Sequence, residues 1–179
     1  AEARTLDAGT WKDPKFAGEK LPTLEEQLAL IPAGKRIFIE LKAGPEIVPA
    51  LKATLAKTHL KRSQLVLITF KLPAAKAAKE AMPDLPVQWL LSAPSKDPKK
   101  PSPDLDEAIA QAKAAKLDGL DVNYHFRMDA AAMKKIRAAG LQIHVWTVDD
   151  PVVAKRWAAL GVDSITTNRP GWLREQLAQ

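Results

Sequence analysis

The stretch Leu65-Val66-Leu67-Ile68 decides the fold class of this chain, because apolar side chains occupy both of its faces. Successive side chains of a β-strand point to opposite faces, so a strand with water on one side alternates between apolar and polar residues. A continuously apolar strand is typical of a parallel sheet that is covered on both faces. The stretch therefore predicts an α/β protein built on a parallel sheet.

Similar runs recur along the chain and alternate with helical segments. Strand-like runs lie at 36–41, 64–70, 87–91, 119–124, 142–148 and 163–167. Segments rich in Ala, Lys and Leu predict helices at about 47–58, 73–82, 104–116, 129–139, 150–160 and 170–178. This alternation predicts right-handed βαβ units. Residues 92–103 predict a surface loop, because the alternation resumes after them, and residues 1–179 are expected to form a single domain.

The segment before the first strand carries its own signals. Residues 1–22 are rich in Gly, Pro and Lys and predict an extended loop, with Trp11 and Phe16 as packing anchors. Thr23 and Glu26 have the spacing of a capping box, in which the hydroxyl accepts from the Glu26 amide and the carboxylate accepts from the Thr23 amide. A short helix is therefore expected to begin after Thr23.

Composition excludes several classes of protein. The 179 residues are 46% hydrophobic and 27% charged, which suits a folded globular domain and excludes global disorder. The sequence has no apolar run of the roughly 18–20 residues that an integral membrane helix needs. The absence of cysteine excludes disulfides, thiolate zinc sites and a cysteine nucleophile, and it leaves the cellular localisation open.

The formal net charge of +6 raises the alternative of a basic module that binds anionic partners such as nucleic acid or a membrane surface. The lysines are dispersed through the helical segments, and no aromatic residues interleave with them as they do in nucleic-acid-binding motifs. We therefore expect no nucleic-acid partner.

The most informative polar residues lie in the run 37–42, Ile37-Phe38-Ile39-Glu40-Leu41-Lys42. Glu40 and Lys42 share one face of this strand, at its carboxyl end, where α/β proteins meet their ligands. A carboxylate suits a hard cation such as Mg²⁺ or Ca²⁺, and an ammonium group suits a phosphate oxygen. The alternative is an ion pair that fixes the strand end without any chemistry.

Several segments resemble the motifs of the glycerophosphodiester phosphodiesterase family, in the same order along the chain. The first two, 21–26 and 37–42, resemble its "iPTLeE…iElK" signature. The other matching segments are 6–12 ("lDaGsWf"), 68–70 (a strand ending in Ser-Phe), 145–149 ("vWTVN") and 161–170 ("GvDgiiTDrP"). The resemblance covers nearly the whole chain.

This resemblance implies a TIM-barrel enzyme that hydrolyses glycerophosphodiesters to glycerol 3-phosphate and an alcohol. A divalent cation, Mg²⁺ or Ca²⁺, is the implied cofactor, and a small-molecule glycerophosphodiester is the implied partner. By position in the motifs, Glu40 corresponds to a metal ligand and Lys42 to a lysine at the phosphate site. Trp146 corresponds to an aromatic residue that lines the substrate pocket, and Phe70 is expected to line it as well.

The chain departs from the family pattern at three matched positions. Thr69 stands where Ser is usual, Asp149 where Asn is usual, and Asn168 where Asp is usual. Each departure exchanges groups of similar size. They are therefore expected to affect specificity rather than the fold.

The acid and base histidines of the family are not found in this chain. Its His-Arg-Gly, Glu-x-Asp and His-Asp strands precede the matched region, so no residue here is assigned as the catalytic acid or base. His59, His125 and His144 stand in other contexts. His144 shares a strand face with Trp146, and a packed or hydrogen-bonded histidine is the favoured interpretation.

The chain is also short for a full barrel, which usually needs about 250 residues. We therefore expect the first two or three βα units to be absent from this chain, and the 179 residues to be inactive without their full-length parent. A non-catalytic relative that keeps the barrel scaffold is the alternative. A sheet without its neighbours exposes its edge strands, which predicts self-association.

Overall fold

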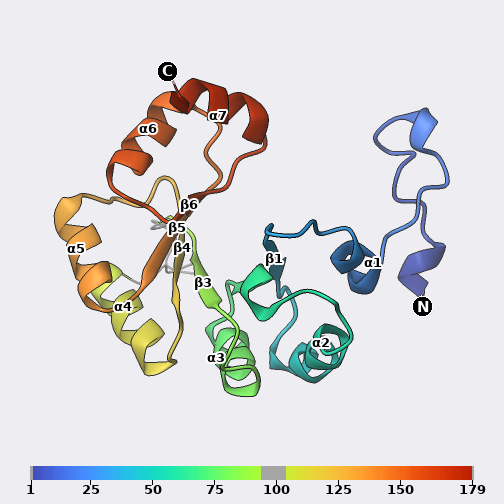
Figure 1. The fold of residues 1–179 in the computed structure, drawn as a ribbon, viewed down its shortest axis with the longest axis horizontal. Helices are drawn as coiled ribbons and strands as arrows, with labels where there is room; N and C mark the ends of the chain where they lie inside the picture. The colour runs from blue at the N-terminus through green and yellow to red at the C-terminus, as the bar shows by residue number, and fades with distance from the viewer. Residues whose placement is uncertain (1, 94–103, 179) are drawn as a thin grey trace.

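The computed structural model describes residues 2–93 and 104–178, and a sheet of parallel strands forms its centre (Figure 1). The strands are β1 (Ile37–Glu40), β2 (Leu65–Thr69), β3 (Val87–Leu91), β4 (Gly119–Asn123), β5 (Gln142–Trp146) and β6 (Ser164–Ile165). Each strand pairs with the next one along the chain, so the spatial order is the chain order. The predicted α/β class and parallel sheet are confirmed. Most of the predicted loop at 92–103 lies outside the described residues.

The helices lie around the outside of the curled sheet (Figure 1). They are α1 (Leu24–Ala29), α2 (Val48–Leu55), α3 (Leu72–Ala81), α4 (Leu105–Ala114), α5 (Ala130–Ala138), α6 (Pro151–Ala159) and α7 (Pro170–Ala178). Helices α2 to α6 each connect one strand to the next, as right-handed βαβ units require. In the described part of the chain, no helix has the length and apolar character needed to cross a membrane.

Local signals fix where these helices begin and end. The predicted capping box is present before α1, because Thr23 Oγ1 accepts from the Glu26 amide (3.2 Å) and Glu26 Oε2 accepts from the Thr23 amide (2.7 Å). Asp150 caps α6 by accepting from the first amides of the helix. Gly161 follows the end of α6 with φ +78°, a conformation that strains any residue with a Cβ atom.

The two faces of the sheet are packed differently. Leu65 and Leu67 are fully buried in the main hydrophobic core, which the strands share with the helices. The opposite, inner face carries polar side chains that are equally inaccessible: Gln88, Asp121 and His144 are 1–3% exposed. The helices therefore rest on an apolar layer, and the inside of the curl is partly polar.

The sheet curls until strands that are not neighbours touch. The ring of Phe38 on β1 lies 5.7 Å from the ring of His144 on β5, in an edge-to-face arrangement. Within residues 2–93 and 104–178, β1 pairs only with β2, and the two-residue β6 pairs only with β5. The architecture is thus a curled (β/α) half-barrel that is open between β1 and β6.

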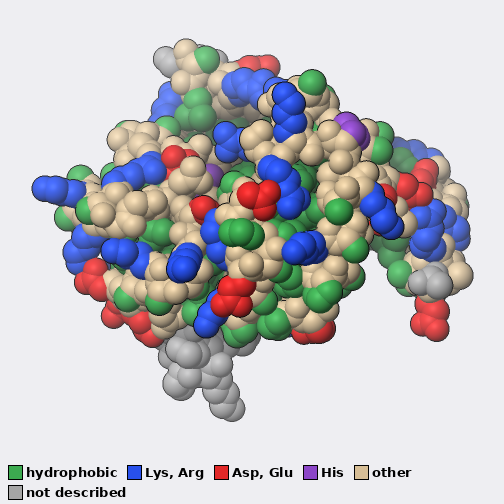
Figure 2. Space-filling model, turned by 60° about the horizontal axis from the view of Figure 1, so that its bottom comes forward, with side chains coloured by type: hydrophobic (Ala, Val, Ile, Leu, Met, Phe, Trp, Pro, Cys, Tyr) green, Lys and Arg blue, Asp and Glu red, His purple; other side chains and the backbone are tan. Residues whose placement is uncertain are grey.

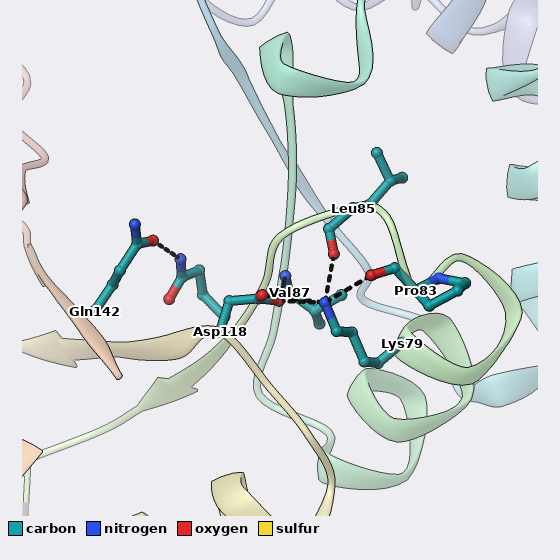
Figure 3. Close-up of polar contacts among 7 residues, drawn as sticks. Lys79, Pro83, Leu85, Val87, Asp118 and Gln142 are labelled. Atoms are coloured by element: carbon teal, nitrogen blue, oxygen red, sulfur yellow. Dashed lines mark hydrogen bonds and ion pairs between the residues drawn. The ribbon is translucent and has the colours of Figure 1, made fainter. Parts of the chain in front are cut away.

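A partly buried lysine ties the amino-terminal ends of two strands to a helix (Figure 3). Lys79 Nζ, near the end of α3, donates to both carboxylate oxygens of Asp118 (2.8 and 3.0 Å) and to the carbonyls of Pro83 and Leu85. Asp118 Oδ2 also accepts from the Val87 amide at the start of β3 (2.7 Å). The Lys79 side chain is 14% exposed, so its ammonium group is largely shielded from solvent.

Residues 2–22 extend away from the barrel beyond α1 (Figure 1). The Asp7 carboxylate organises this segment by accepting from the backbone amides of Gly9, Thr10 and Gly18, and these bonds hold its pKa far below the usual range. The prediction that Trp11 anchors the loop is wrong, because its side chain is 82% exposed. Its indole Nε1 donates to the Ala8 carbonyl, so the hydrogen bond of the ring is made within its own turn of the chain.

Candidate functional site

Glu40 and Lys42 lie together at the carboxyl end of β1, as their spacing predicted. Lys42 Nζ is 3.7 Å from Glu40 Oε2. Leu41 between them is buried, and its amide donates to the Ile68 carbonyl on β2, which holds the charged residues on the other side of the strand. The Lys42 side chain is 81% exposed. Because an exposed pair at this distance stabilises a fold little, both groups remain available to a ligand.

Phe70 and Trp146 meet at the same end of the sheet although they follow different strands. Their rings are 5.5 Å apart at 88°, an edge-to-face contact between the end of β2 and the end of β5. Trp146 Nε1 donates to the Asp121 carbonyl (3.1 Å), and Trp89 Nε1 donates to the Phe70 carbonyl (3.1 Å). These bonds hold the Trp146 ring and the Phe70 backbone, and the two rings form one aromatic wall in which Phe70 is 44% exposed.

The loops that follow β5 and β6 are joined beside this wall. Asp149 accepts from the Thr167 hydroxyl (2.8 Å), the Asn168 amide (2.7 Å) and the Asn168 side chain (2.8 Å). The bonds from Asn168 and Thr167 lower the pKa of Asp149. A cavity of about 230 Å³ opens here, lined by Tyr124, Thr147, Val148, Asp149, Asp150 and Val153. This cavity lies at the carboxyl end of the sheet, and neither Phe70 nor Trp146 is among the residues that line it.

The buried histidine does not join this site, whereas the exposed His125 stacks on Tyr124, which lines the cavity (ring centroids 3.9 Å apart). His144 is 3% exposed, and its Nδ1 lies 2.6 Å from Ser164 Oγ, which confirms the interpretation of a packed, hydrogen-bonded side chain. It lines a cavity of about 330 Å³ with Arg36 and Asp163, at the amino-terminal end of the strands. Burial lowers its pKa. His125 is exposed beside Asn123, with its Nδ1 3.1 Å from Asn123 Oδ1.

One buried acid escaped the sequence argument. Asp121 lies on the inner face of β4, in register with His144 on β5, and is 2% exposed. Its Oδ1 has no hydrogen-bond partner among the described residues, and burial raises the pKa of its carboxyl to about 7. The available signal was an Asp between two apolar residues of a strand, Leu120 and Val122. That position places a carboxyl inside the sheet.

The described residues do not by themselves form the metal site that the resemblance implies. Across residues 2–93 and 104–178, no three His, Asp or Glu side chains gather in a way that suits a metal ion. Mg²⁺ and Ca²⁺ take six or more oxygen ligands, and Glu40 supplies one carboxylate. Glu40 therefore supplies only part of such a site.

A family model matches the chain over residues 1–172, and its description is the glycerophosphoryl diester phosphodiesterase family. The chain belongs to this family. A glycerophosphodiester phosphodiesterase of Bacillus subtilis is 27% identical over 187 residues, which cover 95% of this chain and 61% of that protein. One from Caldanaerobacter subterraneus is 26% identical and covers 94% of this chain and 67% of its own length. The chain thus spans about two thirds of these family members.

Solved structures show the same fold. An Oleispira antarctica phosphodiesterase, solved in complex with the product sn-glycerol-3-phosphate, superimposes with a TM-score of 0.80 at 23% identity, covering 99% of this chain and 70% of that one. A glycerophosphodiester phosphodiesterase from Agrobacterium tumefaciens gives a TM-score of 0.69 at 23% identity, with 99% and 69% covered. Nearly the whole chain therefore shares the fold of the matching part of these two structures, about 70% of each.

Proposed function

We propose that this chain is the carboxyl-terminal part of a glycerophosphodiester phosphodiesterase, which hydrolyses its substrate to glycerol 3-phosphate and an alcohol. The observation that carries the proposal is the Glu40–Lys42 pair at the carboxyl end of β1, in a chain that belongs to this family. The aromatic wall of Phe70 and Trp146 at the same end supports it. Parallel strands bring the charged pair, Phe70 and Trp146, which belong to three separate segments of the sequence, to the same end of the sheet.

The exposure of the charged residues supports distinct roles. The long, 81% exposed Lys42 side chain carries an ammonium group that offsets the negative charge of a phosphodiester. Glu40 is half-enclosed, at 33% exposure of its side chain, and offers oxygen ligands to Mg²⁺ or Ca²⁺. By this proposal, Phe70 and Trp146 contact the rest of the substrate.

The charge distribution gives little support to a basic binding module. On the face shown in Figure 2, Lys and Arg side chains are spread among Asp and Glu rather than gathered in one patch. Several cations have carboxylate partners: Lys135 lies 2.8 Å from Asp106, and Arg62 lies 2.6 Å from Asp84. Pairing of this kind weakens the attraction of a surface for a polyanion.

We further propose that residues outside this chain complete both the barrel and the site. The relatives extend beyond the matched region by about a third of their length, and β1 and β6 each have an unpaired side in the described residues. Two or three additional βα units would close the sheet and add carboxylates beside Glu40. By this proposal the 179 residues alone are inactive.

The first test is the gene that encodes this chain. We expect the codons before Ala1 to specify His-Arg-Gly, Glu-x-Asp and His-Asp strands. Their substitution by unrelated residues would favour the non-catalytic relative instead.

The second test is an assay of the full-length protein for glycerol 3-phosphate release from glycerophosphocholine, with and without EDTA. We expect EDTA to abolish the activity and Glu40→Gln to lower kcat/KM at least about 100-fold, while the control Lys135→Met on the surface leaves it unchanged. Unaltered kcat/KM in Glu40→Gln contradicts the assignment of Glu40. Metal-dependent release by the isolated 179 residues contradicts the proposed inactivity.

A further inference from the structure

His125 is an exposed side chain that the structure nevertheless holds in one position. It lies in the turn that follows β4, where the Phe126 amide donates to the Asn123 carbonyl at 2.8 Å. Phe126, directly after the histidine, is only 4% exposed, so the core anchors the turn on the side away from the strand. The ring of His125 lies 3.9 Å from the ring of Tyr124, with 35° between the two planes.

The side chain of Asn123 determines which ring nitrogen of His125 carries the proton. Asn123 Oδ1 accepts from the His125 backbone amide at 3.0 Å, so this end of the side chain is the oxygen and not the NH₂ group. The same oxygen lies 3.1 Å from His125 Nδ1, which must therefore be the donor. In the neutral ring, Nε2 then carries a free lone pair. Nε2 has no hydrogen-bond partner among residues 2–93 and 104–178.

Burial does not explain why this ring is held. The order of His144, which is 3% exposed, follows from its packing inside the sheet. Ordering an exposed side chain such as His125 costs rotamer entropy, and a hydrogen bond that water can replace offsets little of that cost. Residues that bind ligands are ordered in advance, because a group that is already fixed loses less entropy on binding. Order without burial therefore indicates a side chain that meets a ligand.

The turn is joined directly to the candidate site. Asn123 is the register partner of Trp146 on β5, and the Tyr124 amide donates to the Trp146 carbonyl at 2.7 Å. The Trp146 ring contacts Phe70 in the aromatic wall. Tyr124, on which His125 stacks, also lines the cavity of about 230 Å³. The two residues before His125 thus connect it to both the aromatic wall and the cavity.

We propose that His125 is a substrate-binding residue of the candidate site, whose Nε2 accepts a hydrogen bond from a hydroxyl group of the diester, and that Asn123 is its positioning residue. The inference rests on the proposed function and adds to it the group that is recognised. A lone pair at Nε2 needs a donor, and the hydroxyls of a glycerophosphodiester are donors, whereas the phosphate oxygens are acceptors. Lys42 and His125 therefore serve different parts of the substrate.

The first experiment reads the tautomer of His125 from the imidazole ¹⁵N resonances of the full-length protein at pH 9, assigned with His125→Phe. We expect Nδ1 to give the resonance of a protonated nitrogen and Nε2 that of an unprotonated one. Asn123→Ala removes the acceptor and is expected to leave a mixture of both tautomers. An Nε2–H ring in the parent, or an unchanged Nδ1–H ring in Asn123→Ala, overturns the positioning by Asn123.

The second experiment measures kcat and KM of the full-length protein for two diesters. Glycerophosphocholine carries free hydroxyls only on its glycerol, and glycerophosphoglycerol carries them on its alcohol as well. We expect His125→Phe, which keeps a ring beside Tyr124, to raise KM about 5–20-fold and to change kcat less than about twofold. His59→Phe is the matched control, because His59 is an exposed histidine between α2 and β2, at the other end of the strands.

The two diesters distinguish the possible sources of the hydroxyl. A rise in KM that includes glycerophosphocholine assigns the contact to the glycerol moiety, and a rise confined to glycerophosphoglycerol assigns it to the alcohol. A KM that is unraised for both diesters, relative to His59→Phe, overturns the inference while the parent enzyme remains active. A parent that hydrolyses neither diester overturns the proposed function and the substrate contact together.

Discussion

At the scale of single residues, Glu40 is interpreted either as a metal ligand or as one half of a structural ion pair. The effect of its loss on the stability of the chain distinguishes the two interpretations. If the Glu40–Lys42 pair fixes the end of β1, its loss should destabilise the chain. The 3.7 Å separation and the 81% exposure of Lys42 instead describe a pair worth about 0–1 kcal/mol. We expect Glu40→Gln to change the thermal midpoint of the 179-residue chain by less than about 3 °C in differential scanning fluorimetry. A loss of more than about 6 °C would assign the pair a structural role.

Asp121 gives the chain a pH dependence of known sign. Burial raises the pKa of its carboxyl from 3.8 to about 7, so between these values the folded state binds a proton that the unfolded state has released. The contribution of this carboxyl to stability therefore falls as the pH rises from about 4 to 7. In urea titrations at pH 4 to 8, we expect the parent chain to lose up to about 4 kcal/mol relative to Asp121→Asn. Parallel profiles for the two proteins would show that the carboxyl titrates normally.

The residue scale also shows where sequence reasoning ends. The alternation of strand side chains was enough to place Glu40 and Lys42 on one side of β1. The contact of Phe70 with Trp146 depends on how far the sheet curls, which no local pattern encodes. Asp149 and Asn168 stood out as two separate departures, because their hydrogen bond joins loops that only the packing of β5 and β6 brings together.

At the scale of elements, continuously apolar strands and helix capping signals predicted most of the architecture. The strand predicted at 163–167 is longer than the observed one, because only Ser164–Ile165 pairs as β6. Asp163 before this strand accepts from the Ile143 amide and pairs with Arg137. Backbone bonds from Asp163 and Thr166 to the neighbouring strand continue on either side of these two residues, so the predicted run is bonded to β5 over more than its regular part.

Lys79 is the clearest stabilising connection between elements. Its ammonium group serves Asp118 and two backbone carbonyls, so its removal leaves several partly buried acceptors without a donor. We expect Lys79→Met to lower the free energy of unfolding by about 2–3 kcal/mol in urea titrations. Lys135→Met is the control, since Lys135 and Asp106 are 56% and 69% exposed, and it is expected to cost less than about 0.5 kcal/mol. Equal losses in the two variants would contradict this difference.

At the scale of the whole molecule, the open side of the half-barrel predicts self-association. Unpaired N–H and C=O groups along β1 offer a template for another strand, and Phe38 on this strand is 39% exposed. We expect sedimentation velocity to show dimers or larger species whose share grows between about 5 and 100 µM. A single monomeric species across this range would indicate that the edges are protected.

The contact between Phe38 and His144 also has a consequence for the order of folding. Every strand pairs with its sequence neighbour, so the sheet is able to grow one βα unit at a time from local contacts. The two rings, in contrast, belong to segments more than half the chain apart, and they meet only once the intervening strands are in place. Closing the curl is therefore a late event, and Phe38→Ala is expected to accelerate unfolding in stopped-flow measurements while leaving the refolding rate nearly unchanged. The half-barrel would then open first at the contact between these two rings, before the strands of the sheet separate from one another.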